Sequence, residues 1–129
     1  MDEIRTGKHF DRLSKRRDEL LVTLRHLDNE QHQVEENTDW LDQAAYESRV
    51  KLLDRLSGWY LTEMAEIENA LERIKTHKYG ICLACHEPIE ATRLERLPEA
   101  ACCSACQELR EGLESFDDRA RQGSGFNLK

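Results

Sequence analysis

Four cysteines in the C-terminal half of the chain are the residues whose types and spacing most clearly indicate a chemistry. They form two Cys-x-x-Cys pairs separated by seventeen residues: Cys82 and Cys85, then Cys103 and Cys106. A two-residue gap lets both thiolates of a pair bind one tetrahedral ion. The sequence therefore predicts one Zn²⁺ per chain held by these four thiolates. An iron site and a redox-active dithiol are the alternatives.

His86 directly follows the first pair, and Cys-x-x-Cys-His is also the attachment pattern of c-type haem. Haem attachment requires export, yet the N-terminus is polar and no apolar run of signal-peptide length follows it. No run is long enough for a transmembrane helix either, so we expect no membrane association. A cytoplasmic location follows, in which reducing conditions leave the thiols free to bind metal.

The fifth cysteine, Cys102, is left over from the two pairs. Pairing it with Cys106 would give a three-residue gap, so Cys103 is the expected ligand. A thiol beside a metal centre can be an oxidation sensor, because neighbouring thiolates can form a disulfide with it. The alternative that we favour is a small, half-buried packing residue. His86 could replace a ligand, but four cysteines already complete a tetrahedron.

The composition limits the classes of function. The formal net charge of −7 opposes general nucleic-acid binding and binding to anionic membranes, both of which need Lys and Arg. The charged fraction of 35% with only 6% aromatic residues is typical of solvent-facing helices rather than of a large core. A chain of 129 residues has room for at most one compact domain.

Two long helices are expected before the cysteines. Each carries apolar residues at alternating steps of three and four, which is the seam of a left-handed coiled coil. The first seam comprises Phe10, Leu13, Arg17, Leu20, Leu24, Leu27, Gln31 and Val34. Two of its members, Arg17 and Gln31, are polar. The second is interrupted at Arg49 and Glu63 and comprises Tyr46, Leu53, Leu56, Tyr60, Ile67, Ala70 and Ile74, widened by Leu52, Trp59, Met64 and Leu71.

The segment 35–39 between these helices has no apolar residue and is rich in helix-capping types. The simplest arrangement is an antiparallel hairpin that closes on itself, a rod about 45 Å long. A short C-terminal helix should place Leu109, Leu113, Phe116 and Ala120 over the cysteine knuckles or the hairpin base. The expected fold is mostly α: a coiled-coil hairpin over 1–77 with its acidic tip near 35–44, a four-cysteine zinc finger over 78–108, and a C-terminal helix and tail over 109–129.

The tip of this rod is acidic. From Asp28 to Asp42, both included, the chain has six carboxylates and neither Lys nor Arg. Asp39 and Asp42 are three residues apart, so both carboxylates should share one face at the positive end of the second helix dipole. Capping by Asn37, Thr38 or Asp39 accounts for one of these groups. The absence of cations favours a basic target or the neighbourhood of a divalent metal.

These residues resemble a known family. The zinc-finger signature of the DksA/TraR family is similar to the segment Tyr79-Gly-Ile-Cys82-Leu-Ala-Cys85, to Glu87-Pro-Ile89, and to Arg93-Leu94, Pro98 and Cys103-Ser-Ala-Cys106-Gln107. The segment Asp39-Trp-Leu-Asp42-Gln-Ala44 resembles the Asp-x-x-Asp-x-Ala motif at the coiled-coil tip of that family. The resemblance covers residues 37–110 closely and the first helix by pattern only.

The resemblance implies a bacterial transcription factor that binds RNA polymerase core rather than DNA. Its hairpin would enter the secondary channel and bring the tip residues Asp39, Asp42 and Ala44 near the active site, where they modulate open promoter complexes. It would not be an enzyme. Members that respond to guanosine tetraphosphate carry basic residues where this chain has Glu66, Leu97 and Gln107, which argues against a response to that alarmone.

Three other functions are compatible with parts of the sequence. A zinc-ribbon DNA-binding regulator would need a basic face on residues 79–110, where arginines are outnumbered by glutamates. A structural coiled-coil adaptor could use the same heptads. Acidic tips of the unrelated Gre factors bind the catalytic magnesium of polymerase to stimulate transcript cleavage, but the zinc signature argues against that function here.

Overall fold

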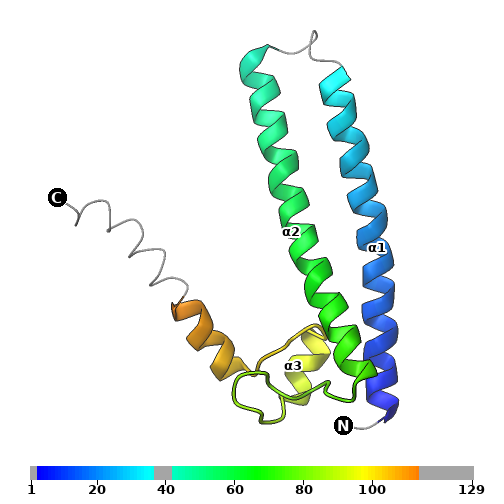
Figure 1. The fold of residues 1–129 in the computed structure, drawn as a ribbon, viewed down its shortest axis with the longest axis vertical. Coiled ribbons are helices and arrows are strands. Elements are labelled where there is room, and N and C mark those ends of the chain that lie inside the picture. The colour runs from blue at the N-terminus through cyan, green and yellow to red at the C-terminus, as the bar shows by residue number, and fades with distance from the viewer. Residues whose placement is uncertain (1–2, 37–41, 114–129) are drawn as a thin grey trace, which may run out of the picture.

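The computed structural model describes residues 3–36 and 42–113. It contains two long helices, α1 (Glu3–Glu36) and α2 (Gln43–Lys75), a short helix α3 (Ala91–Arg96), and a further helical stretch over residues 104–113. Helices α1 and α2 lie side by side and antiparallel, and α3 packs near the base of this hairpin (Figure 1). Within the described ranges the only β pairing is an isolated bridge between Ile81 and Pro88. The predicted mostly-α hairpin with a cysteine-bearing head is confirmed.

The two arms have nearly equal lengths of 34 and 33 residues, so each extends about 50 Å. None of the helices in the described residues is both long and apolar enough to span a bilayer.

The start of α2 is set by Asp42. Its backbone is extended, and its carboxylate accepts a hydrogen bond from the Ala45 N–H, 2.7 Å away. Asp42 is therefore the N-cap, which satisfies one of the free donors in the first turn. In the sequence, Asn37, Thr38 and Asp39 are the residues whose capping would account for one of the acidic groups. These three residues lie outside the described ranges, and the cap of α2 as described falls on the next acidic residue along the chain.

The end of α2 is a left-handed turn at a non-glycine residue. His77 has φ 59°, and its N–H donates to the carbonyl of Ile74 while the Lys78 N–H donates to that of Arg73. These are the two hydrogen bonds of a Schellman motif, which reverses the chain after a helix. The turn directs the chain from the hairpin base into the first cysteine pair.

The predicted seam of α1 is buried or half-buried from Leu13 to Val34, but its first member is wrong. Phe10 is 38% exposed, whereas the neighbouring His9 is 7% exposed and takes the core position. The imidazole of His9 lies against the ring of Tyr79, with 5.8 Å between the ring centroids. Packing of the head on the hairpin base thus selects His9 in preference to the more apolar Phe10.

The predicted seam of α2 is likewise buried or half-buried at all seven positions. Of the four residues expected to widen it, Met64 and Leu71 are buried, but Leu52 and Trp59 are 44% and 63% exposed. The expectation for Leu52 and Trp59 was therefore wrong. The two apparent interruptions of the seam pair across the hairpin: Arg49 with Glu30 at 2.9 Å, and Glu63 with Arg16 at 2.6 Å.

The main core lies where the hairpin base meets the head. Buried residues from both long helices meet buried residues of the head there: Leu13, Leu20, Met64, Ile67, Ala70 and Leu71 with Tyr79, Cys82, Ile89, Leu94 and Cys102. Side-chain hydrogen bonds from the long helices to backbone carbonyls of the head reinforce this contact, from Arg12 to Glu95 at 2.7 Å and from Arg73 to Glu99 and Ala100 at 3.3 Å. The head is therefore held at a defined position relative to the rod.

The stretch 104–113 follows Cys103, includes Cys106 and points away from the hairpin (Figure 1). Leu109 and Leu113 are 68% and 66% exposed, so they cover neither the knuckles nor the hairpin base. That part of the prediction was wrong. The other two residues of the expected stripe, Phe116 and Ala120, lie outside the described residues.

Candidate metal centre and hairpin tip

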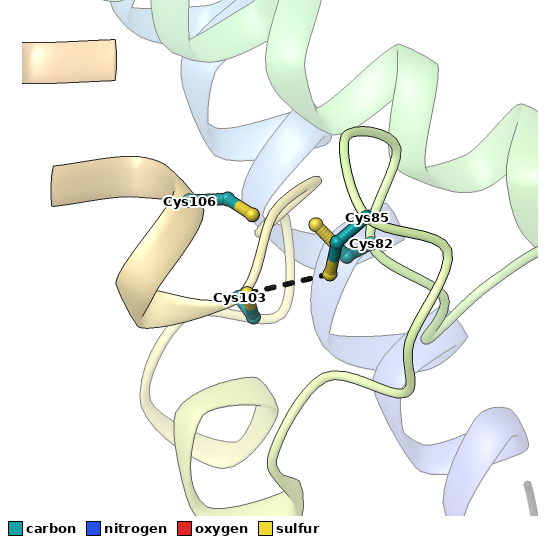
Figure 2. Close-up of side chains that lie close together, drawn as sticks. All are labelled: Cys82, Cys85, Cys103 and Cys106. Atoms are coloured by element: carbon teal, nitrogen blue, oxygen red, sulfur yellow. Dashed lines mark hydrogen bonds between the residues drawn. The ribbon is translucent and has the colours of Figure 1, made fainter. Parts of the chain in front are cut away.

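The sulfur atoms of Cys82, Cys85, Cys103 and Cys106 all lie within 4.8 Å of one another. Figure 2 shows the first two on one loop and the last two at the start of the following helical segment, with their sulfurs directed into a common space. The Sγ atoms of Cys85 and Cys103 are 3.9 Å apart. A tetrahedral zinc ion with Zn–S bonds of about 2.3 Å separates its sulfurs by about 3.8 Å, so this spacing fits zinc.

The first knuckle is built by backbone hydrogen bonds around a tight reversal. Cys82 N–H donates to Glu87 O at 2.9 Å, and His86 N–H donates to Cys82 O at 3.0 Å. His86 accepts a left-handed backbone with φ 62°, as its position after the second cysteine requires. Its side chain is exposed and is not part of the sulfur cluster.

The second knuckle begins the helical stretch 104–113. Cys103 O accepts from Gln107 N–H at 2.9 Å, which places Cys106 in the first turn of that stretch. The two knuckles are joined by a hydrogen bond from Leu83 N–H to Ala101 O, also 2.9 Å. Sulfurs from distant parts of the sequence are thereby held together by the backbone.

The thiols in this cluster perturb one another. Backbone N–H groups, that of Cys85 first, lower the pKa of Cys82 to about 5. Neighbouring sulfurs, that of Cys103 first, raise the pKa of Cys106. One thiolate is thus stabilised by the knuckle, whereas further ionisation places like charges side by side. A divalent cation removes this conflict, so the donor set is suited to a metal ion.

Cys102 lies beside the cluster but does not belong to it. It is 1% exposed, more deeply buried than the half-buried packing residue we expected. Its sulfur accepts from Arg110 Nη1 at 3.6 Å, and its carbonyl accepts from Arg93 Nε at 3.0 Å. Two guanidinium groups therefore hold this residue in the core of the head.

At the opposite end of the hairpin, the structure describes two of the three predicted tip residues. Asp42 caps α2, and Ala44 lies in its first turn with an exposed side chain. Asp39 lies outside the described residues. The segment 28–42 contains neither Lys nor Arg, but the fold brings a cation to it. Arg49 of α2 lies 2.9 Å from Glu30 of α1.

Glu66, Leu97 and Gln107 line one groove although they come from three separate segments. The groove has a volume of about 1080 Å³ and lies between α2, the loop after α3 and the helical stretch 104–113. Burial, reinforced by Glu99 and Glu63, raises the pKa of Glu66. Periodicity alone did not indicate that these residues meet, since the contact depends on how the head packs on α2.

Known proteins resemble the chain in both sequence and fold. Residues 77–112 match the family described as the prokaryotic dksA/traR C4-type zinc finger. The structure of transcription factor DksA2 from Pseudomonas aeruginosa is similar with a TM-score of 0.79 and 30% sequence identity, covering 89% of each chain.

A second solved structure shares the fold at lower identity. It is described as the RNA polymerase binding protein and transcriptional regulator Dks from Chlamydia trachomatis L2, and it aligns with a TM-score of 0.53 and 23% identity over 88% of this chain and 95% of that one. An uncharacterized protein from Aquifex aeolicus (strain VF5) is 38% identical over 73 residues, or 57% of this chain. The match spans about half of that relative's length.

Proposed function

We propose, from the premise that this chain belongs to the DksA/TraR family of C4-type zinc-finger transcription factors, that it regulates transcription by binding RNA polymerase through the secondary channel. The observation that carries the proposal is the similarity of the whole described hairpin and head to a transcription factor at 30% identity. The Dks protein from Chlamydia trachomatis has the same fold and is described as an RNA polymerase binding protein, which supports the choice of partner.

The shape of the molecule suits a channel. A pair of helices about 50 Å long is narrow enough to enter an opening that excludes a globular domain. The head is held at the base of the rod by hydrogen bonds from Arg12 of α1 and Arg73 of α2 to its backbone carbonyls. It would therefore act as a stop that sets the depth of insertion.

The tip residues Asp39, Asp42 and Ala44 are proposed to act near the polymerase active site and to modulate open promoter complexes. Support comes from the acidic sequence around them and from the exposure of Asp42 and Ala44. The net charge of −7 would favour approach to a basic channel entrance. Asp42 also caps α2, because its side-chain oxygen accepts from the Ala45 N–H. The oxygen would therefore serve the helix, and the negative charge would serve the polymerase.

The head is proposed to hold one Zn²⁺ through Cys82, Cys85, Cys103 and Cys106. Metal binding would couple the two knuckles, so that formation of the site and folding of the head are one equilibrium. The metal would be structural, since four protein ligands leave no open position for a substrate.

Direct DNA recognition finds little support in the head. Phosphate binding needs exposed Lys and Arg side chains. Of the three arginines in residues 79–110, Arg93 donates to the Cys102 carbonyl and Arg110 to the Cys102 sulfur, and five glutamates outnumber the three. These guanidinium groups support the loop between the knuckles.

The proposal is tested with purified RNA polymerase core and the full chain. We expect direct binding and a shortened half-life of open complexes at a promoter with an unstable open state. A cleavage-defective Gre factor, which occupies the same channel, should compete for binding. Failure of the chain to bind core polymerase, or binding that such a competitor leaves unchanged, would contradict the proposed site of action.

A further inference from the structure

Helix α1 carries its charges in an order that does not stabilise the helix itself. Residues 3–17 contain six Lys and Arg and two carboxylates, a net of +4, whereas residues 18–36 contain six carboxylates and one Arg, a net of −5. A helix has partial positive charge at its N-terminus and partial negative charge at its C-terminus, so both halves of α1 have the unfavourable sign. The stability of the helix therefore does not account for this order of charges.

The rest of the hairpin does not account for it either. The ion pairs between α1 and α2 in the described residues are Arg16 with Glu63 and Arg49 with Glu30. Several exposed charges of α1 lack such a partner. Within the described ranges no ion pair is formed by Lys8, Arg25 or Glu36, and Asp18 has a contact of 3.9 Å with the adjacent Arg17 alone.

The middle of α1 also exposes two adjacent apolar residues. Leu20 is fully buried in the hairpin, whereas Leu21 and Val22 are 48% and 52% exposed. Their side chains point about 100° and 200° away from that of Leu20 around the helix. Figure 1 shows no other described element along the side of α1 that faces away from α2.

The unpaired charges lie on the same outer face as Val22. Lys8, Val22 and Glu36 are separated by fourteen residues, which is close to four full turns, so their side chains project in one direction. Asp18 and Arg25 are four residues before and three residues after Val22, so they are its neighbours on the helix surface. All five side chains are exposed.

A second copy of α1 has the complementary charges. If two α1 helices lie antiparallel with a two-fold axis beside Val22, the basic half of each lies against the acidic half of the other. The two Val22 side chains then meet at the centre. The charged pairs that come to the same level, each formed twice, are Asp18 of one copy with Arg25 of the second copy and Lys8 of one copy with Glu36 of the second copy.

We propose that two copies of the chain associate antiparallel through this outer face of α1, and that the dimer does not act on polymerase. The dimer places a second hairpin along the rod, which makes it too thick for a channel that admits one pair of helices. Self-association would therefore limit the amount of active factor. This regulation rests on the proposed function, whereas the association follows from the charges and the exposure of α1.

Sedimentation equilibrium of the zinc-loaded full chain measures the association. We expect a monomer–dimer equilibrium that weakens as the salt concentration rises, because salt screens the attraction between exposed charges. Val22→Ser should weaken the dimer about tenfold or more, since the two-fold axis removes the apolar contact from both sides. Leu61→Ser, at a residue of α2 that is 56% exposed, should stay within about twofold of the parent. A parent that is monomeric at every concentration would overturn the proposal.

A charge exchange tests the antiparallel arrangement. Asp18→Arg and Arg25→Asp should each weaken the dimer about fivefold or more, because each places like charges opposite each other twice. The double variant restores both pairs and should dimerise within about twofold of the parent. Within one chain the two residues are about 10.5 Å apart along the helix, so they are not neighbours there. Asp54→Arg changes an exposed charge of α2 and is the control. A double variant no better than the single ones would exclude this arrangement, and circular dichroism verifies that each variant folds.

Titration of purified core polymerase separates the two proposals. Val22→Ser should saturate polymerase at a lower total concentration than the parent, because less of it is held in dimers. If the parent dimerises but does not bind polymerase, the proposed function fails and the association stands. If the parent dimerises and saturates polymerase as Val22→Ser does, the dimer does not regulate. If Val22→Ser weakens polymerase binding but leaves the association of the free chain unchanged, this face of α1 contacts polymerase and the proposal is wrong.

Discussion

The carboxylate of Asp42 accepts a hydrogen bond from the backbone N–H of Ala45 at 2.7 Å, so a residue proposed to act on polymerase also holds the first turn of α2 together. An N-cap of this kind contributes about 1 kcal/mol to helix stability, and asparagine replaces aspartate with little loss. The charge of Asp42 can therefore be removed without removing the cap.

This relationship determines how the tip should be mutated. Asp39→Asn combined with Asp42→Asn should keep the fold and leave polymerase binding within about tenfold, or 1.4 kcal/mol. The effect on open-complex lifetime should be lost, because only the charges are removed. A competitor-challenge assay on promoter complexes measures that lifetime. Asp42→Ala is the contrasting variant, because it removes the cap and should also destabilise α2. If the double asparagine protein still shortens the open-complex lifetime as the parent does, Asp42 has a capping function alone.

The metal assignment predicts a division among the five cysteines. Serine at position 82, 85, 103 or 106 should release the zinc and unfold the head, because a thiolate ligand is lost. Cys102→Ser should retain one zinc per chain, since the Cys102 sulfur lies outside the cluster and instead accepts from Arg110. Elemental analysis after dialysis, with circular dichroism of each variant, gives the comparison. Zinc retained by Cys103→Ser but lost from Cys102→Ser would exchange the two assignments.

His9 predicts a pH dependence of stability. Burial, with the nearby Arg12 second, lowers the pKa of His9 from 6.5, while Glu95 opposes and Arg5 adds to the shift. Its Nδ1 has no hydrogen-bond partner in the described residues. The unfolded chain therefore binds the proton more readily, so the contribution of neutral His9 is complete above pH 6.5 and falls as the pH drops below that value.

Urea unfolding at pH 7.5 and pH 5.5 tests this dependence. His9→Leu should lose less stability than the parent between the two pH values, because it removes the buried titrating group. The parent and variant share any loss caused by thiolate protonation, so their difference isolates His9. His32→Gln changes an exposed histidine between Asp28 and Glu35 and serves as the control. Equal pH sensitivity in the parent and His9→Leu would contradict the prediction.

The elements that sequence predicted well depend on short-range chemistry. The two-residue gaps of the cysteine pairs and the three-four rhythm of the seams are local geometric requirements of a knuckle and of a coiled coil. The structure accordingly places the four sulfurs within 4.8 Å and buries or half-buries the α2 seam. Helix boundaries were less predictable, because several consecutive residues near the tip are able to cap and local sequence does not rank them.

The errors arose where a partner determines the environment of a side chain. Phe10 and His9 are neighbours on α1, and only contact with Tyr79 of the head distinguishes the core position from the exposed one. Trp59 has the apolar character of a core residue, but it is 63% exposed, because periodicity does not show how wide a stripe the opposite helix covers. Arg49 looked like an interruption of the seam because its partner, Glu30, is on the other arm.

The last prediction is that guanosine tetraphosphate does not enhance the action of this protein on polymerase. Glu66, Leu97 and Gln107 stand where alarmone-responsive members carry cations, and they line one groove in this structure. The guanidinium groups that line the groove are engaged within the head: Arg73 and Arg93 with backbone carbonyls, and Arg110 with the Cys102 sulfur. A tetraphosphate would therefore meet Glu66 and Glu99 without a free counter-charge among the described residues.

Open-complex lifetimes should agree within about twofold with and without the alarmone, using polymerase whose own alarmone site has been removed. A family member with basic residues at the three positions is the positive control. A several-fold enhancement with this chain would show that the groove accepts the anion despite its carboxylates.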